Sequence, residues 1–132
     1  MVNHKRVTIL LILLIVLGVA ISTKSLAFSY NEGQDEGTYT QVRVKVYLDE
    51  LSGSASSEHN LYVKSFGGHI ISAHFVLITD LHKKVDIFIP TQSGVWYTRT
   101  LSDQNTYTAT AKSYTLIEDE ATIDAYAQAM VP

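Results

Sequence analysis

Hydrophobic and polar residues alternate along most of the chain after residue 40. Valine or leucine occupies every even position from 42 to 48, with polar or amphipathic residues between them. Alternation with a period of two in β-branched residues is typical of a half-buried strand. The same period recurs over 61–63, 69–79, 85–89, 95–101 and 106–115, and glycine, proline or polar residues separate these segments. The pattern predicts short strands joined by turns.

Three segments fit this pattern less well. Residues 28–39 mix glycine, acidic and amide side chains without a period, which indicates a flexible lead-in. Leu51–Ser57 is rich in serine and glycine and is expected to be a turn or a weak edge segment. After the acidic run at 118–120, alanine or isoleucine takes most odd positions up to 129, and we favour a final strand over a helix there although alanine is a poor strand former.

The number and spacing of these segments define the expected fold. About seven short strands in roughly 90 residues, with a turn every 8 to 12 residues, are expected of a sandwich. A chain of 132 residues has room for one such domain. We therefore predict an all-β fold, an antiparallel β-sandwich of about seven strands over residues 40–132.

One corner of the sequence resembles a known type of sandwich. The stretch from Leu101 to Ala111 is similar to the E–F corner of fibronectin type III and immunoglobulin-like domains, where a leucine stands six residues before a tyrosine. The resemblance implies that the Tyr107 hydroxyl bonds back to the backbone upstream and that Leu101 is its buried partner. Ala109 stands where an immunoglobulin domain has its second cysteine. The resemblance covers 11 residues and implies an architecture but no activity.

The first 27 residues have the pattern of a secretory signal peptide. Lys5 and Arg6 form a basic start, Val7–Ile21 carries no charge, and Ser25 and Ala27 are the small residues that signal peptidase requires. We expect cleavage after Ala27 and a secreted or extracytoplasmic protein. The alternative is an uncleaved membrane anchor, but these 15 residues fall short of the roughly 20 that span a bilayer.

Charge and cysteine content narrow the possible functions. The chain has no cysteine, so disulfides, zinc–thiolate sites and thiol catalysis are all excluded. The part that follows Ala27 holds seven basic and 13 acidic residues, a net charge of −6, without a basic cluster. Such a charge repels phosphate backbones and anionic lipids. We expect no nucleic-acid partner, and membrane contact only through the signal segment if it is uncleaved.

Candidate chemistry is sparse. His74, Asp80, His82 and Asp86 are the only metal-ligating residue types close together in one strand-and-turn region, and this spacing does not enforce a site. The acids at 118–120 and Asp124 lack the regular spacing of a calcium loop. The serines at 52–57 lack the Gly-x-Ser-x-Gly pattern of a hydrolase. We predict no catalytic residue, no metal and no cofactor.

Aromatic residues give the most specific signal of binding. The five that fall on the parity of the outer faces are Tyr47, Tyr62, Trp96, Tyr114 and Tyr126. Flat aromatic side chains on a sheet are a common means of binding sugars or proteins. The alternative interpretation places Trp96 in the core, because a large indole is usually mostly buried.

These observations support a hypothesis of function in three ranks. The first is a non-enzymatic interaction module, secreted or on the cell surface of a bacterium, that binds an extracellular protein or a cell-wall glycan. The second is a secreted bacteriocin-like or antagonist protein. An extracytoplasmic hydrolase is third, since no residue pattern for catalysis supports it.

Overall fold

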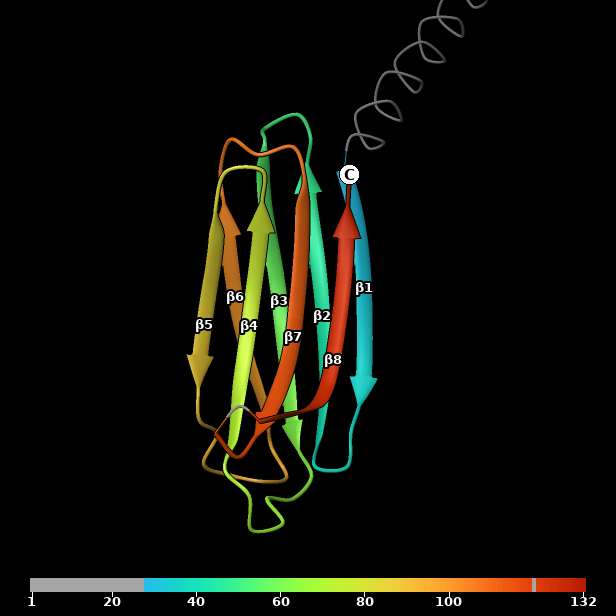
Figure 1. Ribbon diagram of the computed structural model, residues 1–132. Coiled ribbons are helices and arrows are strands. Elements are labelled where there is room, and N and C mark those ends of the chain that lie inside the picture. The colour runs from blue at the N-terminus through green and yellow to red at the C-terminus, as the bar shows by residue number, and fades with distance from the viewer. Residues whose placement is uncertain (1–27, 120) are drawn as a thin grey trace, which may run out of the picture.

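A computed structural model describes residues 28–119 and 121–132, so the predicted signal peptide lies outside the described residues. Eight strands form two antiparallel sheets, one with the order β1-β2-β3-β6 and the other with the order β5-β4-β7-β8 (Figure 1). The strands are β1 (Phe28–Glu36), β2 (Thr40–Asp49), β3 (Ser54–Val63), β4 (Ile71–Thr79), β5 (Lys83–Phe88), β6 (Trp96–Asp103), β7 (Ala109–Ile117) and β8 (Thr122–Val131). The described part of the chain contains no helix that is long and apolar enough to cross a membrane.

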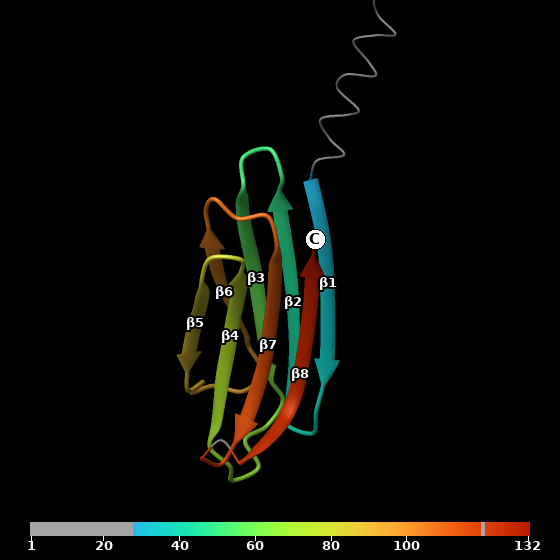
Figure 2. The same ribbon diagram turned by 45° about the horizontal axis from the view of Figure 1, so that its top comes forward.

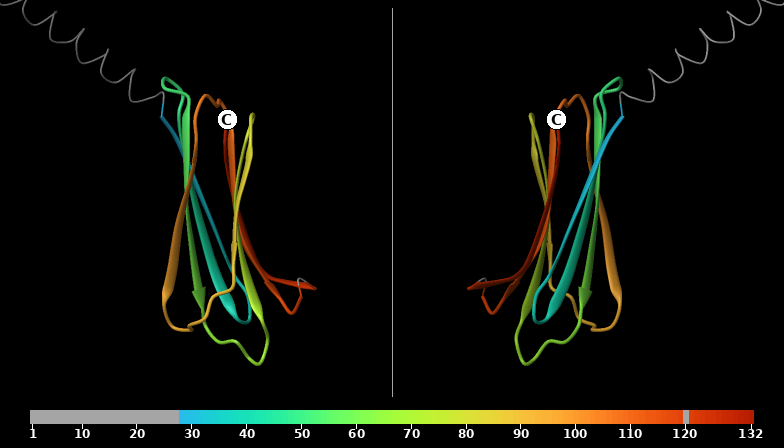
Figure 3. Two further views of the ribbon diagram at one scale, coloured as in Figure 1. Left: turned by 90° about the vertical axis from the view of Figure 1, so that its left-hand side faces the viewer. Right: turned by 90° about the vertical axis from the view of Figure 1, so that its right-hand side faces the viewer.

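The two sheets pack face to face, with β1 and β2 opposite β8 and β7 (Figure 3). The C-terminus and the start of β1 lie at the same end of the molecule (Figure 2). The all-β class is therefore confirmed, with eight strands where about seven were expected. The buried apolar residues between the layers are Val42, Val44, Val46, Leu48, Ala55, Leu61, Val63, Ile71, Ala73, Phe75, Leu77, Ala109, Ala111, Ala125, Ala127, Ala129 and Val131.

The period-two pattern explains the strands in which it is strongest. In β2 every even residue from Thr40 to Leu48 is buried, and the odd residues are exposed or half-buried. The C-terminal segment is the strand that we favoured over a helix, with Ala125, Ala127 and Ala129 facing the core. Small side chains suffice there because the backbone of β1 lies directly against β8. Alanine is placed here by the space available and not by its strand propensity.

The serine-rich segment was predicted wrongly. The turn that we expected up to residue 57 ends earlier, and Ser54 begins β3, a ten-residue strand between β2 and β6. Its inner positions include Ala55, Ser57 and His59, all of which are buried. These residues are small or polar and so lack the hydrophobic signal of a strand. The backbone pairing with β2 and β6, together with partners for each polar group, makes the segment a strand nonetheless.

The expected flexible lead-in is also a strand. Residues 28–36 form β1, which pairs with β2 along its whole length, from Phe28 opposite Asp49 to Glu36 opposite Gln41. Its inner face meets the edge of β8 and not the apolar core, so its sequence has no hydrophobic alternation. Absence of the alternation therefore did not mean absence of a strand.

Strands β1 and β8 approach so closely that backbone meets backbone. A β-carbon placed on Gly33 would lie 2.4 Å from the backbone oxygen of Gln128. On either side, the Asn31 side-chain amide donates a hydrogen bond to the Met130 carbonyl (2.9 Å), and Asp35 accepts one from the backbone N–H of Tyr126 (2.8 Å). Side chains of β1 thus satisfy backbone groups along the free edge of β8, which protects that edge from pairing with another chain.

A single carboxylate fixes the turn between β1 and β2 to the second sheet. Asp124 lies where a bulge interrupts the pairing of β7 with β8. Its carboxylate accepts hydrogen bonds from the backbone N–H groups of Thr38 (3.1 Å), Tyr39 (3.1 Å) and Thr40 (2.8 Å), and from the Thr40 hydroxyl (2.7 Å). The bulge turns Asp124 toward the opposite sheet, so the two layers are held together at this end.

The opposite side of the molecule, between β5 and β6, is filled by larger side chains. The Arg99 guanidinium lies 4.8 Å from the ring centroid of Phe88 and forms an ion pair with Asp86 (3.5 Å). Phe88 also contacts the Tyr97 ring at 5.6 Å between centroids. The sheets are therefore joined by backbone contact on one side and by arginine and aromatic side chains on the other.

Leu101 and Tyr107 do not form the buried pair that the resemblance implies. Leu101 is partly buried against the core, but the Tyr107 side chain is 68% exposed. Asp80 holds this corner instead. Its carboxylate accepts hydrogen bonds from the Thr106 hydroxyl and from the backbone N–H groups of Tyr107 (3.0 Å) and Thr108 (3.4 Å), and the Thr106 bond lowers the pKa of Asp80.

A buried histidine forms the polar centre of the core. The His59 side chain is fully buried, its Nε2 lies 2.7 Å from Ser57 Oγ, and its Nδ1 lies 2.8 Å from Ser113 Oγ on the other sheet. The ring stacks on Phe75 with 5.0 Å between centroids. Burial lowers the pKa of His59 to about 4. The neutral imidazole, with both nitrogens in hydrogen bonds, ties β3 to β7.

Replacing Gly33 by alanine tests the contact between β1 and β8. The new methyl group meets a backbone oxygen that has no rotamer to change, so one strand must move. We expect Gly33→Ala to lower the free energy of unfolding by about 1 to 3 kcal/mol. Urea denaturation followed by Trp96 fluorescence measures this. The neighbouring exposed Gln34→Ala is the control, and equal effects of the two substitutions would contradict the contact.

The buried histidine predicts a dependence of stability on pH. As the pH falls, the unfolded chain protonates His59 near the ordinary pKa of 6.5, whereas the folded state stays neutral until about pH 4. Stability is therefore full above pH 6.5 and falls by about 3 kcal/mol between pH 6.5 and 4. Asp103, whose pKa is lowered to about 2 chiefly by a hydrogen bond from Thr79, loses its contribution only below its ordinary value of 3.8.

Urea denaturation at pH 6.5, 5.5 and 4.5 separates this effect from others. The wild-type chain should lose stability steadily over this range. His59→Gln should be less stable at pH 6.5 but should vary little with pH between 6.5 and 4.5. A wild-type curve parallel to that of the variant would show that His59 is not the titrating group.

Candidate functional site

The five aromatic residues singled out in the sequence lie on outer faces, but not on the same face. Tyr47, Tyr62 and Trp96 lie on the outer face of the sheet β1-β2-β3-β6. Tyr114 and Tyr126 lie on the outer face of the sheet β5-β4-β7-β8. The single aromatic surface that parity suggested is therefore divided between two surfaces on opposite sides of the molecule.

The outer face of the sheet β5-β4-β7-β8 is mainly apolar and is called the apolar face here. Its rows across the strands follow the register, for example Ile87, His74, Tyr114 and Tyr126. The large apolar side chains that it presents are Val76, Ile78, Val85, Ile87, Tyr114, Leu116, Ile123, Tyr126 and Met130. Several of them are more than half exposed, such as Ile123 at 57%.

The apolar face has a packed interior of its own. His74 and Val76 of β4 point outward, yet both are buried because neighbouring side chains cover them. The His74 ring stacks on Tyr114 with 4.8 Å between centroids, and Tyr114 stacks on Tyr126 with 5.8 Å. A continuous row of three rings thus crosses β4, β7 and β8 and gives this face a rigid centre.

A shallow depression of about 500 Å³ occupies this face beside the ring row. Val76 and Tyr114 contribute to its lining, and Ile123 lines it from the start of β8. The ends of β7 and β8 that meet at their hairpin curve away from the opposite sheet, so that the face is concave (Figure 3). The charged side chains that line the depression are Lys83 and Lys112. Neither forms an ion pair with a described residue.

The outer face of the sheet β1-β2-β3-β6 is different in character and is called the polar face here. Its central rows contain Glu32, Lys45 and Glu58, and then Gln34, Arg43, Asn60 and Thr98. Aromatic residues stand at the two ends of these rows. Tyr47 contacts Tyr30 at 4.9 Å between centroids at one end, and Tyr62 contacts Trp96 at 5.3 Å at the other.

The position of Trp96 decides between the two interpretations of its strand. The indole is 43% exposed on the polar face, whereas Tyr97 points inward and packs against the core. Arg99 shares the inward parity of Tyr97 but lies at the open side, where its guanidinium contacts Phe88. An arginine on the inner parity therefore does not require the indole to be buried.

The four residues considered as metal ligands are not gathered at one point. His82 Nδ1 lies 2.9 Å from Asp103 Oδ2, and Asp86 belongs to the side between β5 and β6. His74 belongs to the ring row, and Asp80 holds the corner between β6 and β7. Each of these side chains therefore has a structural contact of its own.

The acids near the C-terminus are likewise engaged in structure. Glu118 Oε1 lies 2.5 Å from His69 Nδ1, and Asp124 holds the turn between β1 and β2. Among residues 28–119 and 121–132, no three histidine or acidic side chains are grouped so that they would hold a metal ion.

Sequence reasoning missed most of the apolar face. Ile87, Ile123 and Met130 share the outward parity of their strands, and this parity was visible in the sequence. Apolar residues on both parities of β4 were also visible and indicated a partly covered outer face. What the sequence did not reveal is that β5, β7 and β8 are the neighbours of β4, which brings these residues together.

Comparison with known proteins gives no relative of this chain. No protein-family model, no curated protein and no solved structure matches it.

Proposed function

We propose that this chain is an exported, non-enzymatic interaction module that binds another protein through the apolar face. The observation that carries the proposal is the concave apolar surface on β5, β4, β7 and β8. Soluble monomeric proteins rarely expose contiguous apolar patches of this kind unless the patch binds a partner. The ring row at its centre, Tyr114 and Tyr126 with His74, resembles the aromatic centres of protein interfaces.

The charges on the apolar face indicate the chemistry of the partner. The depression is lined by lysines and no acid among its charged residues, although the chain as a whole is acidic. A partner with apolar side chains and one or two carboxylates would satisfy Lys83 and Lys112. A second copy of this chain would instead bring lysines toward lysines, and the net negative charge of the domain disfavours an anionic membrane.

The architecture supports a module of the fibronectin type III or immunoglobulin-like kind. In chain order, β2 to β8 occupy the places of strands A to G. The order β2-β3-β6 then repeats A-B-E, and β4-β7-β8 repeats C-F-G. Two differences accompany this similarity: β5 pairs with β4, and β1 is an additional strand beside β2. Sandwiches with this order carry many functions, so the proposal of binding depends on the surface.

A non-enzymatic role is supported by how the reactive side chains are used. His59 is buried between two serines, and the His82 imidazole is paired with Asp103. Asp80 and Asp124 accept backbone hydrogen bonds in turns. These groups stabilise the fold where they stand.

Photo-crosslinking tests the proposed binding surface. A photoreactive phenylalanine derivative replaces Ile123 on the apolar face in one variant and Thr100 on the polar face in a second, and both are expressed in the native cells. We expect one partner polypeptide to be crosslinked from position 123 and not from position 100. With that partner purified, Tyr126→Ser should weaken binding about fivefold or more, since an interface aromatic side chain is lost.

The charge argument predicts a second result with the same partner. Lys112→Glu should weaken its binding more than Lys112→Ala does, and Lys45→Glu on the polar face should have little effect. Crosslinks of the chain only to itself would identify a second copy as the occupant and overturn the proposal. Equal crosslinking from positions 123 and 100 would also overturn it.

A further inference from the structure

The polar face carries an aromatic pair that has no role in the fold. Trp96 and Tyr62 lie side by side on β6 and β3, with 5.3 Å between ring centroids and 44° between ring planes. Above the indole, the Arg43 guanidinium reaches across from β2 and lies 4.5 Å from the ring centroid. The three side chains form one partly exposed group at the end of the sheet away from Tyr47.

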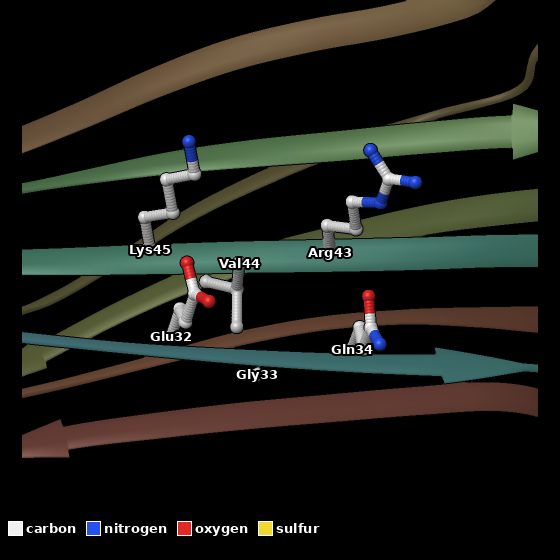
Figure 4. A pocket seen from close by; sticks show the side chains of 6 residues that line it. All are labelled: Glu32, Gly33, Gln34, Arg43, Val44 and Lys45. Carbon is white, nitrogen blue, oxygen red and sulfur yellow. The ribbon is translucent and has the colours of Figure 1, made fainter.

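A shallow depression continues from this group toward β1. It has a volume of about 520 Å³, and its polar lining consists of Glu32, Gln34, Arg43 and Lys45. These side chains stand on the same side of β1 and β2, with Glu32 opposite Lys45 and Gln34 opposite Arg43 (Figure 4). Because Arg43 belongs to both the depression and the aromatic pair, the two form a single strip. The strip crosses four strands, a distance of about 14 Å.

Hydrogen-bonding groups along the strip are available to a ligand. The side chains of Arg43 and Gln34 make no hydrogen bond or ion pair with a described residue. Asn60 accepts a hydrogen bond from the Thr98 hydroxyl (2.9 Å) and keeps its amide donors. An arginine and two amides therefore border an aromatic surface and offer donors and acceptors in nearly the plane of the sheet.

This combination selects the chemistry of the ligand. A sugar ring has one apolar face that stacks on an aromatic side chain and a rim of hydroxyl groups that bond to amides and guanidinium. The strip and its border hold the positive charges of Arg43 and Lys45 and the negative charges of Glu32, Glu36 and Glu58. The excess of acid disfavours polyanions such as nucleic acids and sulfated or uronic-acid polymers.

We propose that the polar face is a second binding site, for a neutral oligosaccharide. Trp96 and Tyr62 stack against one ring, and Arg43 and Gln34 bond to hydroxyl groups of the neighbouring rings along the strip. The ligand class and the surface both differ from those of the protein partner proposed above, so the site stands independently of that function.

Trp96 is the only tryptophan of the chain, so its emission reports directly on this site. The full chain is titrated with cellohexaose and with N-acetylchitohexaose, and a hyaluronan hexasaccharide of equal length serves as the anionic control. We expect a saturable change in Trp96 emission with at least one neutral hexasaccharide and none with hyaluronan. Arg43→Ala and Tyr62→Ala should each weaken binding about tenfold.

Tyr114→Ala on the apolar face is the matched control and should leave the titration unchanged. Near-ultraviolet circular dichroism and the urea midpoint confirm that each variant is folded. The proposal is overturned if neither neutral hexasaccharide alters the emission, if only hyaluronan does, or if Tyr114→Ala weakens binding as much as Tyr62→Ala. The crosslinking result at position 123 does not depend on any of these outcomes, so the two proposals fail separately.

Discussion

The contact between the backbones of β1 and β8 is the constraint on which the rest of the structure depends. It requires Gly33 in β1 and small inward residues in β8, where alanine fills positions 125, 127 and 129. Larger side chains such as Phe75 and Phe88 occupy the interior farther away. The size of the inward side chains thus increases from the side of β1 and β8 toward the side of β5 and β6. Burial alone does not set the distance between the sheets; side-chain size sets it strand by strand.

This arrangement leaves the outer faces as the surfaces for recognition. The free edge of β8 is covered by side chains of β1, and Arg99 with Asp86 joins β6 to β5 at the other side. Edges covered in this way are poor sites for adding another strand. The two outer faces differ sharply, since one carries apolar side chains with two lysines and the other carries alternating charges with aromatic ends. Each face is therefore suited to a different class of ligand.

Sequence patterns predicted the strands whose inner face meets apolar side chains. Strand β2, with valine or leucine at the even positions from 42 to 48, and the alternating part of β8 belong to this group. The patterns failed for β1, whose inner side chains bond to the backbone of β8, and for the first half of β3, where Ser57 and His59 replace apolar residues. In both cases hydrogen bonds to distant residues stabilise the strand, and local hydrophobicity does not record them.

The same limit applied to the candidate site. Parity indicated that Tyr62, Trp96, Tyr114 and Tyr126 point outward, but it did not assign them to a sheet. That assignment follows from the crossing of β3 to β6 and of β4 to β7, which depends on the whole chain. Tyr107 shows the reverse error, because a local motif implied a buried contact while Asp80, 27 residues earlier, holds the corner. Long-range pairing is what a single sequence without relatives leaves undetermined.

The opposite directions of the two faces have a mechanical consequence if both proposals hold. A protein bound on β4, β7 and β8 and a saccharide bound on β1, β2, β3 and β6 would be separated by the full thickness of the two sheets, about 10 Å between layers. Neither ligand would obstruct the other, and the core that links His59 to Ser113 would lie between them. Because that core is close-packed and its buried polar side chains have hydrogen-bond partners, the described residues form a stiff connector. Such a connector would hold a partner protein at a fixed distance from a glycan, with no hinge required.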